Sequence, residues 1–164
     1  MPALELDDGT VLTQSLAIIE WLDETRPEPP LLPREPLARA RVRAFALAIA
    51  AEIHAVQNLK VLNRVKALGH AQEVANAWAH DVIAEGLAAC ETMLRDGAGC
   101  GPFCFGTTPG LADLCLVPQL YNARRFSVPL DPFPTLRRAD ESASALPAFA
   151  AAHPDRIAQE ELAQ

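Results

Sequence analysis

The sequence predicts a mainly α-helical protein with a short β-hairpin and one helix at its start. Residues 111–125 are apolar on nearly every side in their first half, which is typical of a helix buried in the centre of a domain. Two long windows, 36–68 and 72–95, carry the helical pattern. Only residues 3–6 and 11–12 read as strands, joined by a turn at 7–10. The strands are too short to form a domain by themselves, so the helices must supply the core.

Composition and charge narrow the class of protein. The 164 residues are half hydrophobic, which suffices for a well-packed core, and the net charge of −7 argues against nucleic acid as a partner. No apolar run approaches the ~18 residues of a membrane span. The start, Met1–Glu5, lacks the basic segment of a signal peptide, and four cysteines without such a signal indicate reduced thiols in the cytoplasm.

The first thirty residues predict a small unit of two strands and a helix. Leu16, Ile19 and Leu22 lie on one face of the helix expected over 16–24. The proline-rich stretch 26–30 ends that helix and stiffens the chain. We therefore expect a first domain over 1–28, a linker over 29–35 and a helical domain over 36–164.

Proline and glycine mark the expected ends of helices in the helical domain. Pro36 suits a first helical position, and the pattern predicts one continuous helix to about Leu68, where Gly69 stops it. The further helices are expected over these ranges: 72–95, 111–125, 136–146, and a short one from Pro147 to about 153. A glycine-rich loop fills 96–108.

The helix over 111–125 has clear end signals. Gly110 can act as N-cap, and Asp113 lies where a carboxylate reaches back to the first backbone amides. Pro118 should kink the helix. Arg124 and Arg125 make its end basic. The attraction of their positive charges to the negative end of the helix dipole is one sufficient explanation for both.

The cysteine and histidine patterns give little support for redox or metal chemistry. Cys100 and Cys104 are separated by three residues in a glycine-rich loop, whereas the thioredoxin-type redox motif has two. An ordinary loop is the favoured interpretation. The four histidines are scattered, and none pairs with a cysteine at zinc-finger spacing.

Two polar clusters are candidates for ligand binding. Gln14 and Ser15 lie where a strand passes into a helix N-terminus, a natural anion site, although ordinary capping by Thr13 or Ser15 is the alternative. His54, Gln57 and Asn58 have the i, i+3, i+4 spacing of one helix face. A polar face exposed to solvent explains that spacing equally well.

Three segments resemble the zeta-class glutathione transferases, the maleylacetoacetate isomerases. They are QSLAIIEWL (14–22), QNLKVL (57–62), and LADLCLVPQLYNARRF (111–126) followed by DPFPT (131–135). The likeness extends from Pro2 to about Arg156. The family usually has Ser or Thr where this chain has Gly110, a difference that costs only a few tenths of a kcal/mol.

The resemblance implies a thioredoxin-like domain followed by an all-helical one. This chain matches the family from the second half (ββα) of the thioredoxin-like domain, with Pro2 at the position of the family's cis-proline. The serine-rich motif that activates glutathione is then expected before residue 1, so no catalytic residue is assigned within these 164 residues. A misread gene start is the favoured reason, with a natural or artificial fragment as the alternative.

The resemblance also implies a cofactor, a substrate and a reaction. The implied glutathione-binding residues are these: Met1, through its backbone, Gln14, Ser15, His54, Asn58, Leu59 and Lys60. Arg125 matches an arginine that holds a substrate carboxylate, a task suited to the guanidinium fork. The expected activity is glutathione-dependent cis–trans isomerisation of maleylacetoacetate to fumarylacetoacetate, in tyrosine and phenylalanine breakdown, by a cytoplasmic homodimer. The alternatives are maleylpyruvate isomerisation, general glutathione transfer, or a non-catalytic binding or dimerisation remnant.

Overall fold

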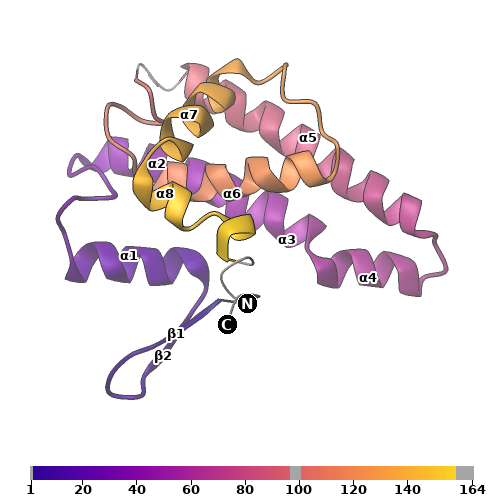
Figure 1. Cartoon of the computed structure of the whole chain (residues 1–164), viewed down its shortest axis with the longest axis horizontal. Helices are drawn as coiled ribbons and strands as arrows, with labels where there is room; N and C mark the ends of the chain where they lie inside the picture. Colours follow the sequence, from indigo (N-terminus) through magenta and orange to yellow (C-terminus); the bar gives the residue numbers. More distant parts are fainter. Residues whose placement is uncertain (1, 97–100, 158–164) are drawn as a thin grey trace.

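The computed structural model describes residues 2–96 and 101–157 of the chain. A β-hairpin and helix α1 (Ser15–Thr25) lie beside a larger helical body (Figure 1). The mainly helical fold predicted from the sequence is confirmed, and so is the small N-terminal unit.

The hairpin is short and regular. Strands β1 (Ala3–Glu5) and β2 (Val11–Thr13) pair antiparallel, with Leu4 opposite Leu12. Gly9 in the turn has a φ of 83°, a conformation that costs glycine little. Both predicted strands are therefore present, within a residue of the expected bounds.

Helix α1 is attached to the helical body by packing and by charge. Leu16 and Ile19 contact the buried core. Glu20 accepts two hydrogen bonds from Arg43, at 3.0 Å to Nε and 2.6 Å to Nη2, in a bidentate pair. The hydrogen bond to Glu20 is the main reason that the pKa of Arg43 is raised. This pair joins the middle of α1 to α2.

The single long helix predicted over 36–68 is wrong. The chain forms four pieces: α2 (Pro36–Leu47), a π-helical segment η1 (Ala48–Ile53), α3 (His54–Gln57) and α4 (Leu59–Ala67). The break falls at Asn58, whose ψ of 164° is extended. Its side chain donates to Ala55 O and accepts from Val61 N–H, so it ends one helix and caps the next.

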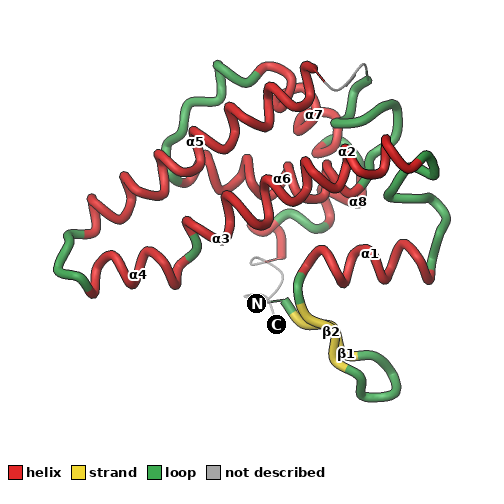
Figure 2. Tube along the Cα trace, turned by 180° about the vertical axis from the view of Figure 1, so that it is seen from behind, coloured by secondary structure: helices red, strands yellow, loops and turns green. Residues whose placement is uncertain are grey.

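The remaining helices match the prediction closely. They are α5 (Gln72–Asp96), α6 (Leu111–Arg125), α7 (Pro134–Ser144) and α8 (Pro147–Ala151). Helix α6 runs through the middle of the helical body, and α4 and α5 form a hairpin that extends to one side of it (Figures 1 and 2). Leu116 and Leu120 are fully buried, which confirms α6 as the central helix.

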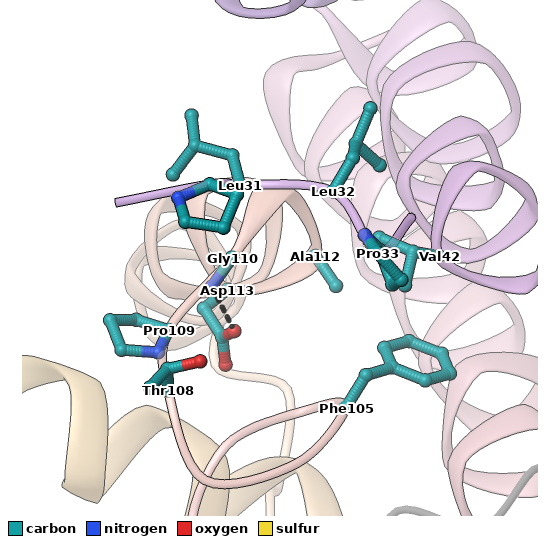
Figure 3. A pocket seen from close by; sticks show the side chains of 11 residues that line it. Leu31, Leu32, Pro33, Val42, Phe105, Thr108, Pro109, Gly110, Ala112 and Asp113 are labelled. Carbon is teal, nitrogen blue, oxygen red and sulfur yellow. Dashed lines mark hydrogen bonds between the residues drawn. The ribbon is translucent and has the colours of Figure 1, made fainter. Parts of the chain in front are cut away.

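The start of α6 is held by its own carboxylate. Asp113 Oδ2 accepts from Gly110 N–H at 2.9 Å (Figure 3). Its Oδ1 accepts from Cys104 N–H, also at 2.9 Å. The predicted reach of Asp113 to the backbone amides is therefore confirmed. A Cβ at residue 110 would lie 2.8 Å from the carbonyl oxygen of Leu31, whose oxygen accepts from Leu111 N–H. The linker backbone at Leu31 thus leaves little room for a side chain at residue 110.

The helical run Pro36–Ala67 has the length and the apolar composition of a membrane span. Its π-segment and the break at Asn58 interrupt it, and Phe45 and Ile49 are fully buried in the protein core. Of the most apolar window of this run, 33% is buried inside the protein, and the absence of a membrane partner stays a prediction.

Candidate functional site

The strand-to-helix junction at Gln14 and Ser15 has the features of an anion site. Gln14 is the N-cap of α1 with a φ of 72°, and Ser15 is exposed as the first residue of the helix. The side chain of Gln14 makes no cap hydrogen bond, and among the described residues no hydrogen bond of the Thr13 or Ser15 side chain caps the helix, so the predicted alternative of capping by Thr13 or Ser15 is not what the structure shows. A positive φ at a non-glycine residue is strained, and such strain clusters where ligands are bound. The backbone N–H groups of the first helical turn and the serine hydroxyl can donate to a carboxylate.

The second predicted cluster is divided by the break in the helix. His54 is half-buried, Gln57 is buried, and Asn58 is exposed and no longer helical. The three residues therefore do not share one helix face, which corrects the prediction from their spacing. The physical reason is that the asparagine side chain competes successfully for backbone groups that a continuous helix would pair.

Asn58 and Lys60 instead lie in an open groove between α4 and α5. The groove has a volume of about 580 Å³. Arg64 and His70 also line it, together with the half-exposed ring of Trp78, whose indole N–H donates to Val56 O at 2.9 Å. Leu59 is exposed but does not line the groove. Of the candidate residues in this segment, Asn58 and Lys60 therefore line the groove, whereas Leu59 and His54 do not.

His54 lies outside that groove and is half-buried. Burial lowers the pKa of its ring, and the nearby side chain of Gln119 acts in the opposite direction. At neutral pH the ring is therefore neutral, with one nitrogen as donor and the other as acceptor. Gln119 is a residue that sequence reasoning missed. The available signal was a polar residue in an otherwise apolar stretch of α6.

The two arginines at the end of α6 have different surroundings. Arg124 donates to Asp140 at 2.6 Å, and that carboxylate is almost completely buried, so Arg124 ties α6 to α7. Arg125 is exposed, and it has no ion-pair partner within residues 2–96 and 101–157. Its charge acts on the neighbouring Tyr121, whose hydroxyl donates to Asp155 at 2.8 Å. Arg125 is therefore the arginine that remains able to bind an added carboxylate.

The buried thiols do not form a redox site. Cys90, Cys104 and Cys115 are free and buried, and burial raises the pKa of Cys90 to about 12 and of Cys115 to about 11. Burial, and next the charge of Asp113, also raise the pKa of Cys104. Cys100 and Met1 lie outside the described residues. Within the described part of the chain, no cluster of His, Cys, Asp and Glu could hold a metal ion.

Comparison with known proteins decides the family. The model of the glutathione S-transferase C-terminal domain matches residues 20–154, and that of the N-terminal domain matches residues 1–30. The chain belongs to the glutathione S-transferase family. Its zeta-class resemblance is confirmed as well, since its relatives at 45–50% identity are named maleylacetoacetate isomerase.

Individual relatives support the same class. The maleylacetoacetate isomerase of Rhizobium meliloti is 50% identical over 157 residues, which cover 95% of this chain and 73% of the relative. A crystal structure of maleylacetoacetate isomerase from Anaeromyxobacter dehalogenans with glutathione bound in its active site is 51% identical, with a TM-score of 0.85. It is matched over 92% of this chain and 69% of its own. A bacterial maleylpyruvate isomerase described as zeta class is 42% identical, with a TM-score of 0.90, over 95% of this chain and 74% of its own.

Proposed function

We propose that this chain acts in the glutathione-dependent cis–trans isomerisation of maleylacetoacetate to fumarylacetoacetate. The observation that carries the proposal is the match at 50% identity, over nearly the whole chain, to a protein of that name. The strained junction at Gln14 supports it independently, since the backbone N–H groups at the start of α1 and the exposed hydroxyl of Ser15 are donors that fit a carboxylate.

Glutathione is the proposed cofactor, and when bound it supplies the nucleophilic thiol of the reaction. Gln14 and Ser15 bind the γ-glutamyl end through side-chain and backbone donors at the start of α1. The backbone of Met1 pairs with the cysteinyl part. Asn58 and Lys60 are proposed to add contacts from the groove between α4 and α5, and His54 and Leu59 to add contacts from outside that groove. The cation of Lys60 favours a peptide with two carboxylates.

Arg125 is proposed to hold a carboxylate of the substrate. Its guanidinium is exposed at the end of α6 without an ion-pair partner in the described part of the chain, in contrast to Arg124. A planar fork of donors binds carboxylates in a bidentate manner, which fixes the orientation of a dicarboxylic acid.

The group that activates the thiol is proposed to lie in the part of the relatives that this chain does not match. The chain covers 73% of the Rhizobium meliloti protein. A free thiol of the cysteine type ionises near pH 8.5, so bound glutathione would remain mostly protonated at neutral pH without an activating group. No catalytic residue is assigned to the 164 residues themselves.

Maleylpyruvate isomerisation is the second candidate, since a neighbour of that name has a TM-score of 0.90 and 42% identity. Both substrates are dicarboxylic acids with a cis double bond, and both fit the same role for Arg125. For the complete enzyme we further propose a homodimer in the cytoplasm, with the thioredoxin-like half of one subunit against the helical half of the other.

The test compares two chains with both substrates in the presence of glutathione. The 164-residue chain is expected to show no appreciable turnover, while a longer chain that adds the family's preceding βαβ unit converts maleylacetoacetate faster than maleylpyruvate. In the longer chain, Arg125→Ala is expected mainly to raise KM for the substrate, and Arg137→Ala on α7 serves as a control. Equal activity of both chains would contradict the location of the activating group, and a folded longer chain without activity would support the non-catalytic remnant.

A further inference from the structure

Tyr121 of the central helix α6 is attached to the turn that follows α8. Its hydroxyl donates to Asp155 Oδ1 at 2.8 Å, although the two residues are 34 positions apart in the sequence. The ring of His153 packs edge-on against the ring of Tyr121, with centroids 5.4 Å apart and an interplanar angle of 89°. These two contacts hold the turn against the face of α6 that carries Tyr121.

The turn itself fixes the position of Asp155. The carbonyl oxygen of His153 accepts from Arg156 N–H and Ile157 N–H, so a helical turn begins here, with Pro154 at its first position. The backbone N–H of Asp155 donates to His153 Nδ1 at 3.3 Å, so the histidine side chain caps the turn. Asp155 is therefore held through its backbone and through its carboxylate, although its side chain is 65% exposed.

Arg125 lies on the same face of α6 as Tyr121. The two residues are four positions apart, and residues at that spacing on a helix are neighbours, with Cβ atoms about 5–6 Å from each other. The turn thus brings the carboxylate of Asp155 to the helix face that carries the Arg125 guanidinium. In agreement with this placement, the pKa of Tyr121 is raised mainly by the hydrogen bond to Asp155, whereas the charge of Arg125 acts to lower it.

Arg125 makes no ion pair with Asp155 in the described part of the chain, in spite of their shared helix face. The adjacent Arg124 is different, because it is already paired with the buried carboxylate of Asp140 at 2.6 Å. A hydroxyl and a guanidinium can both donate to a carboxylate, and here the hydroxyl of Tyr121 has taken that role. The two donors therefore compete for one acceptor, and the observed arrangement leaves the guanidinium unpaired.

We propose that Tyr121 is a positioning residue that holds the Asp155 carboxylate away from Arg125, so that Arg125 stays available for a carboxylate of the substrate. The proposal rests on the proposed function, in which Arg125 binds a dicarboxylic acid. Without the hydroxyl of Tyr121, the Asp155 carboxylate loses its donor and can pair with Arg125 instead. That internal pair then competes with the substrate. Because exposed ion pairs are weak, the competition is expected to change affinity only about two- to fivefold.

The test uses the 164-residue chain, with maleate as a small cis dicarboxylic acid. The NMR signal of the Arg125 Nε–H, assigned from an Arg125→Lys chain, reports both maleate binding and pairing within the protein. Tyr121→Phe removes only the hydroxyl, and the double variant Tyr121→Phe, Asp155→Asn also removes the competing charge. The matched control is Tyr121→Phe, Asp131→Asn, which removes a charge from another exposed aspartate, one that pairs with Arg137.

In Tyr121→Phe the Arg125 signal is expected to shift in the absence of maleate, and maleate affinity to fall about two- to fivefold. Adding Asp155→Asn should reverse both changes, whereas adding Asp131→Asn should reverse neither. The proposal is overturned if Tyr121→Phe changes neither quantity, if Asp155→Asn does not restore them, or if Asp131→Asn restores them equally well. If the Arg125 signal of the unaltered chain does not respond to maleate, the proposed role of Arg125 fails, whereas the shift measured without maleate still decides whether Tyr121 holds Asp155 away.

Discussion

Replacing Asp113 with alanine is expected to destabilise the protein strongly. The carboxylate is 2% exposed and accepts one hydrogen bond from Gly110 N–H and one from Cys104 N–H, both at 2.9 Å. Hydrogen bonds to charged groups contribute about 1.5–3 kcal/mol each, and a carboxylate at a helix N-terminus adds about 0.3–1 kcal/mol. Because water can replace part of the lost bond to Gly110, we expect the free energy of unfolding to fall by about 3–5 kcal/mol.

The assay is urea unfolding followed by circular dichroism and tryptophan fluorescence. Asp113→Asn keeps one acceptor oxygen and should fall between the alanine variant and the unaltered chain. Asp131→Ala is the control, because that carboxylate is 93% exposed and its ion pair with Arg137 should contribute at most about 1 kcal/mol. The reasoning is refuted if Asp113→Ala loses no more stability than Asp131→Ala.

Three further predictions concern other buried groups. Glu91→Ala should lower the free energy of unfolding by about 2–4 kcal/mol, because the Glu91 carboxylate accepts from two backbone N–H groups at the start of α7. Glu141→Ala, at an exposed position, should lower it by less than about 1 kcal/mol. Similar losses for the two variants in urea unfolding would count against this role of Glu91. In a Cys100→Ser chain, a disulfide reagent at neutral pH should react with no thiol of the native protein and with three thiols after unfolding. The reason is that Cys90, Cys104 and Cys115 are buried, which raises the pKa of each thiol. Reaction of any of them in the native state would contradict this prediction. Burial lowers the pKa of His54 in the folded state, so near and below pH ~6.5 the unfolded chain binds more protons than the folded one. The free energy of unfolding should therefore fall on acidification, and it should fall less steeply in His54→Gln. Parallel profiles of unfolding free energy against pH for the two chains would exclude this contribution.

Local signals predicted most of the fold. Helix α6 (Leu111–Arg125) has the predicted bounds, because a sequence that is apolar on nearly every side leaves few alternatives to a buried helix. The hairpin followed from a turn sequence and short apolar alternation. Proline positions gave the starts of α7 and α8 to within two residues.

The interruption of the predicted long helix depends on contacts that no local pattern contains. The π-turn of η1 is accommodated at Gly86, more than thirty residues further along the chain. Asn58 carried a usable signal, since asparagine is a preferred N-cap, but a helical spacing on both sides of it predicted continuity. Likewise, Glu91 caps the start of α7 from 44 residues away, and nothing near either partner indicates it.

The candidate site was predictable in part. Gln14 and Ser15 stood out because a strand precedes a helix there, but the positive φ of Gln14 became visible only in the structure. The division of the second cluster follows from the break at Asn58, and the π-turn of η1 directly precedes His54. Sequence spacing assumes an unbroken helix, so it could not predict either outcome.

Glutathione binding at the start of α1 is the proposal on which the other functional assignments depend. The most direct test is a titration of the isotope-labelled 164-residue chain with glutathione, followed through its backbone amide NMR signals. Saturable shifts are expected at Gln14 and Ser15, with smaller ones from His54 to Lys60. In a Gln14→Ala, Ser15→Ala chain that still folds, the first set should be lost. Saturable shifts confined to other helices, or unchanged binding by the double variant, would contradict it.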